Sequence, residues 1–134
     1  DGAGDVTKTH VAWSTDENVP DVSSPASDGK VVVILTTSGV LTCHDAASGR
    51  RLWMHDYEMD FHASPVIADG NIYLFSQKGA AFVVGAGPEF KEVSRSTLPD
   101  EFHATPAVVG DSLYVRGIKE LWRLGGAPAP AASK

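Results

Sequence analysis

Two histidines recur in nearly the same local sequence, each with an acidic residue two positions before it. His62 lies in the segment Asp-Phe-His-Ala-Ser-Pro and His103 in Glu-Phe-His-Ala-Thr-Pro, so Asp60 and Glu101 are the two acids. Imidazoles backed by carboxylates bind metal ions and titrate near neutral pH. Asp60, His62, Glu101 and His103 are therefore the candidate binding residues, with His62 and His103 as candidate ligands of a divalent metal ion.

A structural role competes with this interpretation. A histidine that is copied together with its repeat can cap the strand that follows it or hydrogen-bond a neighbouring backbone carbonyl. The sequence has no Ser/His/Asp arrangement in a nucleophile-elbow context, no Cys-x-x-Cys pair and no glycine-rich phosphate loop. We therefore assign no catalytic residue.

The spacing of the two histidines belongs to a longer repeat. Pro25, Pro65 and Pro106 occupy the same position in three copies of one segment, at separations of 40 and 41 residues. A fixed period in this range is typical of an array built from one supersecondary unit. The two histidines are then carried at equivalent points of adjacent units.

Short apolar runs bounded by turn residues follow each proline segment. Runs of this length and composition predict β-strands. No helix is predicted, because no stretch of about a dozen residues keeps apolar positions at helical spacing without Gly or Pro. Besides a first strand directly after each proline, strands are expected at 31–35, 40–43 and 51–55, at 72–75, 81–84 and 92–96, at 113–115 and 121–124, and, as a leading strand, at 9–15.

Twelve strands in units of four indicate an all-β fold of four-stranded antiparallel sheets. Continuous apolar strands such as 31–35 favour burial on both faces, as when such sheets pack face to face as the blades of a β-propeller. The chain then holds about three blades' worth of strands. The first strand of a blade is the innermost one, so His62 and His103 are expected at one mouth of the central channel.

The first unit resembles the pyrroloquinoline-quinone-like (PQQ-like) propeller repeat. The match rests on residues 24–29, the strand at 31–35, residues 39–41 and residues 45–53, which end on Leu-Trp. The second unit departs from the pattern after Val84 and has no tryptophan where Trp53 would predict one. The third unit ends without a fourth strand.

The resemblance divides the chain into a repeat region at 9–124 and two flanks. Residues 1–8 are Gly-rich and polar and residues 125–134 form a Pro/Ala-rich tail, so both flanks are expected to be flexible. The resemblance also implies that Trp13 and Trp53, again 40 residues apart, dock one blade against the next. Within the repeat region it implies the leading strand 9–15, repeats at 22–57 and 62–98 and a partial repeat at 103–124.

Three blades are too few for a ring, since propellers have about four to eight. Two arrangements are open. The chain is part of a larger propeller, or two chains exchange their spare first strands and close a six-bladed homodimer.

Composition limits the partners. A net charge of −6 and a pI of about 5.2 argue against nucleic acid, whose affinity comes mostly from Lys and Arg. No apolar stretch has the length of a membrane span, so membrane insertion is not expected. The single cysteine, Cys43, is expected as a small buried thiol. The family resemblance implies a bacterial periplasmic or extracellular location.

The resemblance implies a non-catalytic propeller that serves as a scaffold or binding module for a protein or glycan. The alternative is an enzyme, or a fragment of one, with a His-lined channel mouth that binds a divalent metal or a small ligand. Quinoprotein dehydrogenases of this repeat class combine calcium, a catalytic Asp and often a vicinal disulfide. No such set can be placed in this sequence, so PQQ is not an expected cofactor.

Overall fold

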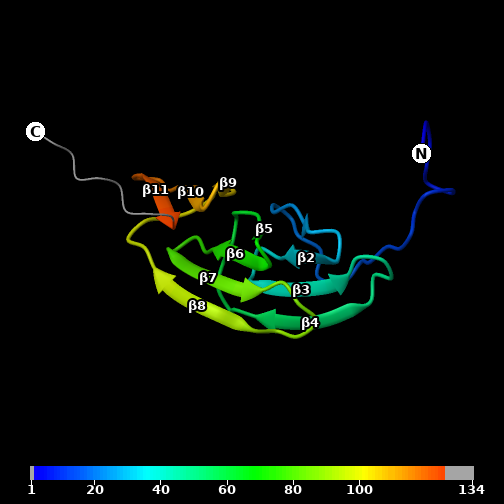
Figure 1. The fold of residues 1–134 in the computed structure, drawn as a ribbon, viewed down its shortest axis with the longest axis horizontal. Coiled ribbons are helices and arrows are strands. Elements are labelled where there is room, and N and C mark those ends of the chain that lie inside the picture. Colours follow the sequence, from blue (N-terminus) through cyan, green and yellow to red (C-terminus); the bar gives the residue numbers. More distant parts are fainter. Residues whose placement is uncertain (1, 126–134) are drawn as a thin grey trace, which may run out of the picture.

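The computed structural model describes residues 2–125, which form three antiparallel sheets that follow one another along the chain (Figure 1). Within these residues there is no helix at all, and so none that could cross a membrane. The all-β prediction is confirmed. The first sheet contains β1 (Ala26–Ser27), β2 (Val31–Leu35), β3 (Val40–Asp45) and β4 (Arg51–Asp56), the second contains β5 (Val66–Ala68), β6 (Asn71–Phe75), β7 (Ala80–Gly85) and β8 (Glu92–Thr97), and the third contains β9 (Ala107–Val109), β10 (Ser112–Arg116) and β11 (Leu121–Gly125).

Each sheet is a meander in which consecutive strands are neighbours. The same turn chemistry builds the first two sheets: the amide of Val40 donates to Thr36 Oγ1 at 2.9 Å, and the amide of Ala80 donates to Ser76 Oγ at 2.9 Å. The turn between β6 and β7 requires Gly79, because its φ is 96° and a side chain there would collide with the carbonyl of Leu98.

The first two sheets share a shift of strand register at the same position of the repeat. In the first sheet Cys43 pairs with Trp53, and the register shifts between Cys43 and His44. In the second sheet Val83 pairs with Ser94, and the shift falls between Val83 and the next residue. Position 53 in the first sheet therefore corresponds to position 94 in the second.

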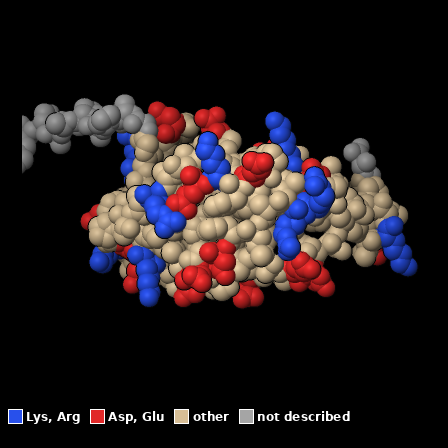
Figure 2. Space-filling model, turned by 90° about the horizontal axis from the view of Figure 1, so that it is seen from below, with Lys and Arg blue, Asp and Glu red and all other residues tan. Residues whose placement is uncertain are grey.

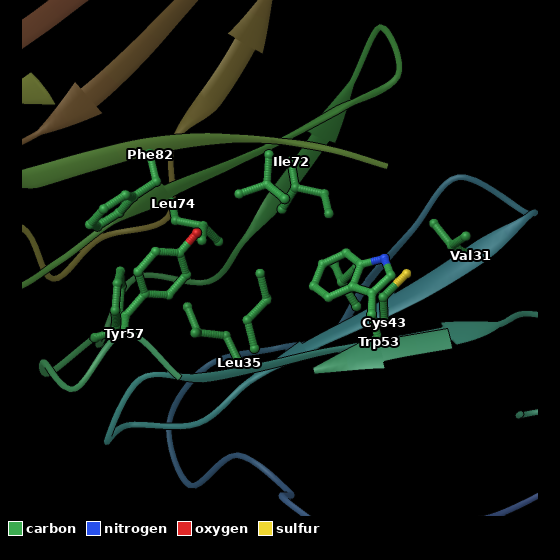
Figure 3. Close-up of a cluster of buried hydrophobic side chains, with 12 residues drawn as sticks. Val31, Leu35, Cys43, Trp53, Tyr57, Ile72, Leu74 and Phe82 are labelled. Atoms are coloured by element: carbon green, nitrogen blue, oxygen red, sulfur yellow. The ribbon is translucent and has the colours of Figure 1, made fainter. Parts of the chain in front are cut away.

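Two apolar clusters lie between adjacent sheets. Burying a large apolar side chain contributes about 1.5 to 3 kcal/mol, so these clusters hold the array together. Cys43 is fully buried, and burial together with the charge of Asp28 raises the pKa of its thiol to about 11. The first cluster (Figure 3) contains Val31, Val33, Leu35, Leu41, Cys43, Trp53, Tyr57, Phe61, Ile72, Leu74, Phe82 and Val84, and the second contains Ala63, Phe75, Ala81, Phe102, Leu113 and Val115.

Two tryptophan side chains tie the end of one repeat to the next. The Trp53 indole N–H donates to the carbonyl of Gly87, in the turn between β7 and β8, at 2.9 Å. The Trp13 indole N–H donates to the carbonyl of Ala46, in the turn between β3 and β4, also at 2.9 Å. Trp13 therefore meets the first sheet as Trp53 meets the second.

The leading strand predicted at 9–15 is wrong, because these residues form no strand. A β-strand requires backbone pairing with a neighbouring strand, and residues 9–15 pair with none of the described strands. They lie next to the first sheet, at the opposite end of the array from β11 (Figure 1). The tail predicted at 125–134 lies outside the described residues except for Gly125, which ends β11.

Candidate functional site

The segments that carry the two histidines are held by the residues directly before them. Phe61 is 1% exposed and Phe102 is fully buried. The amide of Phe61 donates to the carbonyl of Thr37 at 2.9 Å, and that of Phe102 donates to the carbonyl of Gln77 at 3.3 Å. His62 and His103 therefore leave the backbone from anchored positions.

A ladder of hydroxyl groups joins the same position of adjacent repeats. The amide of Ser24 donates to Ser64 Oγ at 2.8 Å, and the amide of Ser64 donates to Thr105 Oγ1 at 3.4 Å. Each of these residues precedes the repeated proline. The ladder fixes the spacing between the segments that enter β1, β5 and β9, and so the spacing between the histidines.

The two imidazole rings meet. The Nδ1 atoms of His62 and His103 lie 3.0 Å apart, with the ring centroids at 5.1 Å and an angle of 54° between the planes. A hydrogen bond between these two nitrogens requires one Nδ1 to carry a proton and donate, and the other to be unprotonated and accept. The His103 side chain is 45% exposed, which leaves the pair open to solvent.

The two acids do not contribute equally. Glu101 Oε2 lies 3.8 Å from His103 Nε2, within the range of an ion pair and beyond a hydrogen bond. Asp60 instead lines a separate hollow with Glu58 and Lys78. Among residues 2–125, no three His, Cys, Asp or Glu side chains converge into a group that could hold a metal ion.

Asp100 is a buried carboxylate that the sequence analysis missed. Its oxygens accept hydrogen bonds from the Trp122 indole at 2.9 Å and from the amides of Lys119 and Glu120, each at 3.1 Å, as well as from Glu101. Burial alone would raise the pKa of Asp100, but these four bonds to the ionised form lower it far below its usual range. Asp100 therefore fixes the turn before β11.

The sequence offered little sign of Asp100. The matching position of the second repeat is Met59, and three of the four donors, from Lys119, Glu120 and Trp122, reach Asp100 only in the folded chain. Trp122 of β11 supplies the side-chain donor.

The architecture can be compared with known proteins. A family model described as outer membrane protein assembly factor BamB matches residues 3–86, which is more than half of the chain. The chain belongs to this family. Its predicted resemblance to PQQ-like propellers is thereby confirmed. No individual curated protein gives a significant sequence match.

Solved structures agree on the fold. BamB from Moraxella catarrhalis superposes with a TM-score of 0.64 at 18% identity, covering 75% of this chain and 30% of BamB. Quinohemoprotein alcohol dehydrogenase from Comamonas testosteroni gives 0.60 at 16% identity, covering 72% of this chain and 17% of the enzyme. The corresponding enzyme ADHIIG from Pseudomonas putida HK5 gives 0.59 at 15%, with coverages of 70% and 16%.

These similarities concern the fold alone. The propeller prediction is confirmed, and the chain spans less than a third of the length of each of these three structures. A BamB and two enzymes share this fold, so the fold alone does not determine the function of this chain.

Proposed function

We propose that this chain is part of a non-catalytic β-propeller that binds a protein partner. The observation that carries the proposal is the third sheet, which within residues 2–125 ends on its third strand, β11, and leaves apolar side chains exposed. The family description, an assembly factor for outer membrane proteins, supports a protein as the partner.

The free edge of β11 is suited to accept a strand. In the described part of the chain, β11 pairs with β10 alone. Leu121 of β11 is 67% exposed, and Ile118, in the turn before it, is 56% exposed. An uncovered edge strand offers a row of backbone donors and acceptors to another chain, and added strands bind at such edges.

Residues 9–15 indicate what kind of strand would fit. Trp13 docks on the first sheet as Trp53 docks on the second, which is the behaviour of a fourth strand of a preceding blade. Figure 1 shows these residues beyond the first sheet, far from β11 of the same chain. A fourth strand of this type, supplied from outside the described array, would complete the third sheet.

Two sources could supply that strand: further blades of a longer chain, or a second copy of this chain in a six-bladed ring. Light scattering on a sizing column across a dilution series separates them. A mass of one chain, 14.2 kDa, supports further blades as the source, and a stable mass of twice that value supports exchange between two copies.

The proposal is tested with a peptide that copies residues 9–15, titrated into the protein and followed by fluorescence anisotropy. We expect saturable binding that Leu121→Lys abolishes, because a charge on the edge strand blocks pairing. Val93→Lys is the matched control, since Val93 is 54% exposed on β8, the outer strand of a complete sheet. Absence of binding, or equal loss in both variants, would contradict the proposal.

The surface charge also favours a protein over nucleic acid. Figure 2 shows acidic and basic side chains interspersed over one face, without a continuous basic area. Polyanions bind where Lys and Arg neutralise successive phosphates. We place the protein in the periplasm or outside the cell, in line with the family description, and a glycan partner is the competing outcome of a binding screen.

A second candidate function is an enzyme, or enzyme fragment, that uses a metal ion at His62 and His103. The observation that favours it is the 3.0 Å separation of the two Nδ1 atoms. Ligand distances of about 2.1 Å to each nitrogen would give an angle of roughly 90° at the metal, which suits neighbouring ligands of Cu²⁺ or Ni²⁺. Glu101, whose Oε2 lies 3.8 Å from His103 Nε2, would then help to orient the His103 ring.

The metal proposal is tested by calorimetric titration with Ni²⁺. We expect one site that is lost in His62→Ala and in His103→Ala and kept in His10→Ala, because His10 lies in the exposed N-terminal segment. Binding that survives both substitutions would exclude the pair as the site. Turnover by the metal-loaded protein would favour the enzyme, and metal binding without turnover would favour the scaffold.

A further inference from the structure

The contact between the first and second sheets is filled by aromatic rings from β4. Trp53 is 9% exposed and packs edge-on against Phe90 with the ring centroids 5.3 Å apart. His55, two residues farther along β4, stacks on the same Phe90 at 4.2 Å. Trp53 therefore fills space between the first and second sheets, which we call the first interface; the second interface is the contact between the second and third sheets.

The second interface lacks both rings. The strand register makes Ser94 the counterpart of Trp53, because Ser94 pairs with Val83 as Trp53 pairs with Cys43. Counting two residues farther along the same strands, Ser96 is the counterpart of His55. Two large side chains of the first interface are thus replaced by hydroxymethyl groups in the second.

A cavity of about 490 Å³ lies at this place, between the second and third sheets. Most of its wall is apolar, with Ser96 on one side. Two acidic residues, Asp69 and Asp111, also line the cavity, from the turns before β6 and β10. The side chains that form its main walls are Tyr73, Phe75 and Val83 of the second sheet and Leu113 and Leu124 of the third.

We propose that this cavity binds a small aromatic molecule that carries an N–H or ammonium group. The aromatic class follows from the first interface, where the equivalent space holds the indole of Trp53. The donor follows from the two carboxylates and the serine hydroxyl, which can accept hydrogen bonds from the ligand. The volume is within the range of small-molecule sites, about 300 to 1,000 Å³. Leu124 and Gly125 of β11 line this cavity, which therefore adjoins the proposed strand-binding edge but lies between the second and third sheets.

The probe for the test is indole, titrated into the complete chain and followed by saturation-transfer NMR. We expect saturable binding by the wild type and its loss in Ser94→Trp, in which the chain supplies its own indole to the cavity. The same variant should melt at a higher temperature, because its indole gives the second interface the kind of packing that Trp53 gives the first. Ser96→Phe fills the cavity from a residue that lines it and serves if Ser94→Trp does not fold.

The matched control is Thr97→Trp, which adds an indole one residue beyond Ser96, on the opposite face of β8, because side chains alternate along a strand. Loss of binding in Ser94→Trp or Ser96→Phe with binding kept in Thr97→Trp supports the site. No saturable binding by the wild type, binding kept in both filled variants, or equal loss in the control overturns it.

Discussion

Replacing Trp53 by alanine removes the side chain that joins the first two sheets. The indole is 9% exposed, packs against Phe90 and donates its N–H to the carbonyl of Gly87. It belongs to the first apolar cluster, to which both sheets contribute side chains (Figure 3). The substitution therefore opens a cavity between the two sheets and removes the hydrogen bond to the turn between β7 and β8.

The expected loss of unfolding free energy is large for a chain of this size. Truncation of a buried Trp to Ala costs about 3 to 5 kcal/mol, whereas the total stability of a domain is about 5 to 15 kcal/mol. Trp53→Phe keeps a ring and loses the hydrogen bond to Gly87, which contributes about 1 kcal/mol. Trp53→Phe should therefore lose much less stability than Trp53→Ala.

Urea unfolding followed by circular dichroism measures both losses. Met54→Ala is the matched control, because Met54 is the next residue and is 52% exposed, so its change should stay within about 0.5 kcal/mol. Added indole should stabilise Trp53→Ala more than it stabilises the wild type, because only the variant has the new cavity. If Trp53→Ala loses no more stability than Met54→Ala, the docking role of Trp53 is refuted.

Three further predictions concern single residues. Asp100→Asn should destabilise the protein at pH 7. It should also flatten the fall in urea midpoint below about pH 4, because the lowered native pKa of Asp100 gives stability that is complete above the unfolded pKa and lost below it. An unchanged slope would exclude this role. Gly79→Ala should lower the melting temperature more than Gly70→Ala, because both have positive φ and only Gly79 faces backbone carbonyls; equal losses would show that crowding is unimportant. Tyr57→Phe should keep or raise the melting temperature, since among residues 2–125 the buried hydroxyl has no hydrogen-bond partner; a clear drop would reveal a partner.

Much of the fold could be predicted because its signals are local. The strand at 31–35 is bounded by turn residues on both sides and appears at those limits in the structure. The 40-residue period then placed equivalent strands in the second and third sheets. Residues 9–15 carry the same composition and form no strand, because strand formation depends on a neighbour that local sequence does not encode.

The candidate site was predictable only where it follows the repeat. The histidines lie at equivalent positions of adjacent units, so the period alone brings His62 and His103 to the same end of neighbouring sheets. Asp60 shares the motif, yet its side chain lines another hollow. Asp100 has no acidic counterpart in the second repeat, where Met59 occupies its position, and two of its donors lie in a turn about 20 residues later that tertiary folding supplies.

Hydrogen exchange along the edge strands tests whether β11 accepts a strand from outside the array. The protein is measured by mass spectrometry with and without the peptide that copies residues 9–15. We expect slower exchange in Leu121–Gly125 when the peptide is present and unchanged exchange in β4 and β8, the outer strands of complete sheets. Unchanged exchange in Leu121–Gly125, or equal protection of β4 and β8, would contradict it.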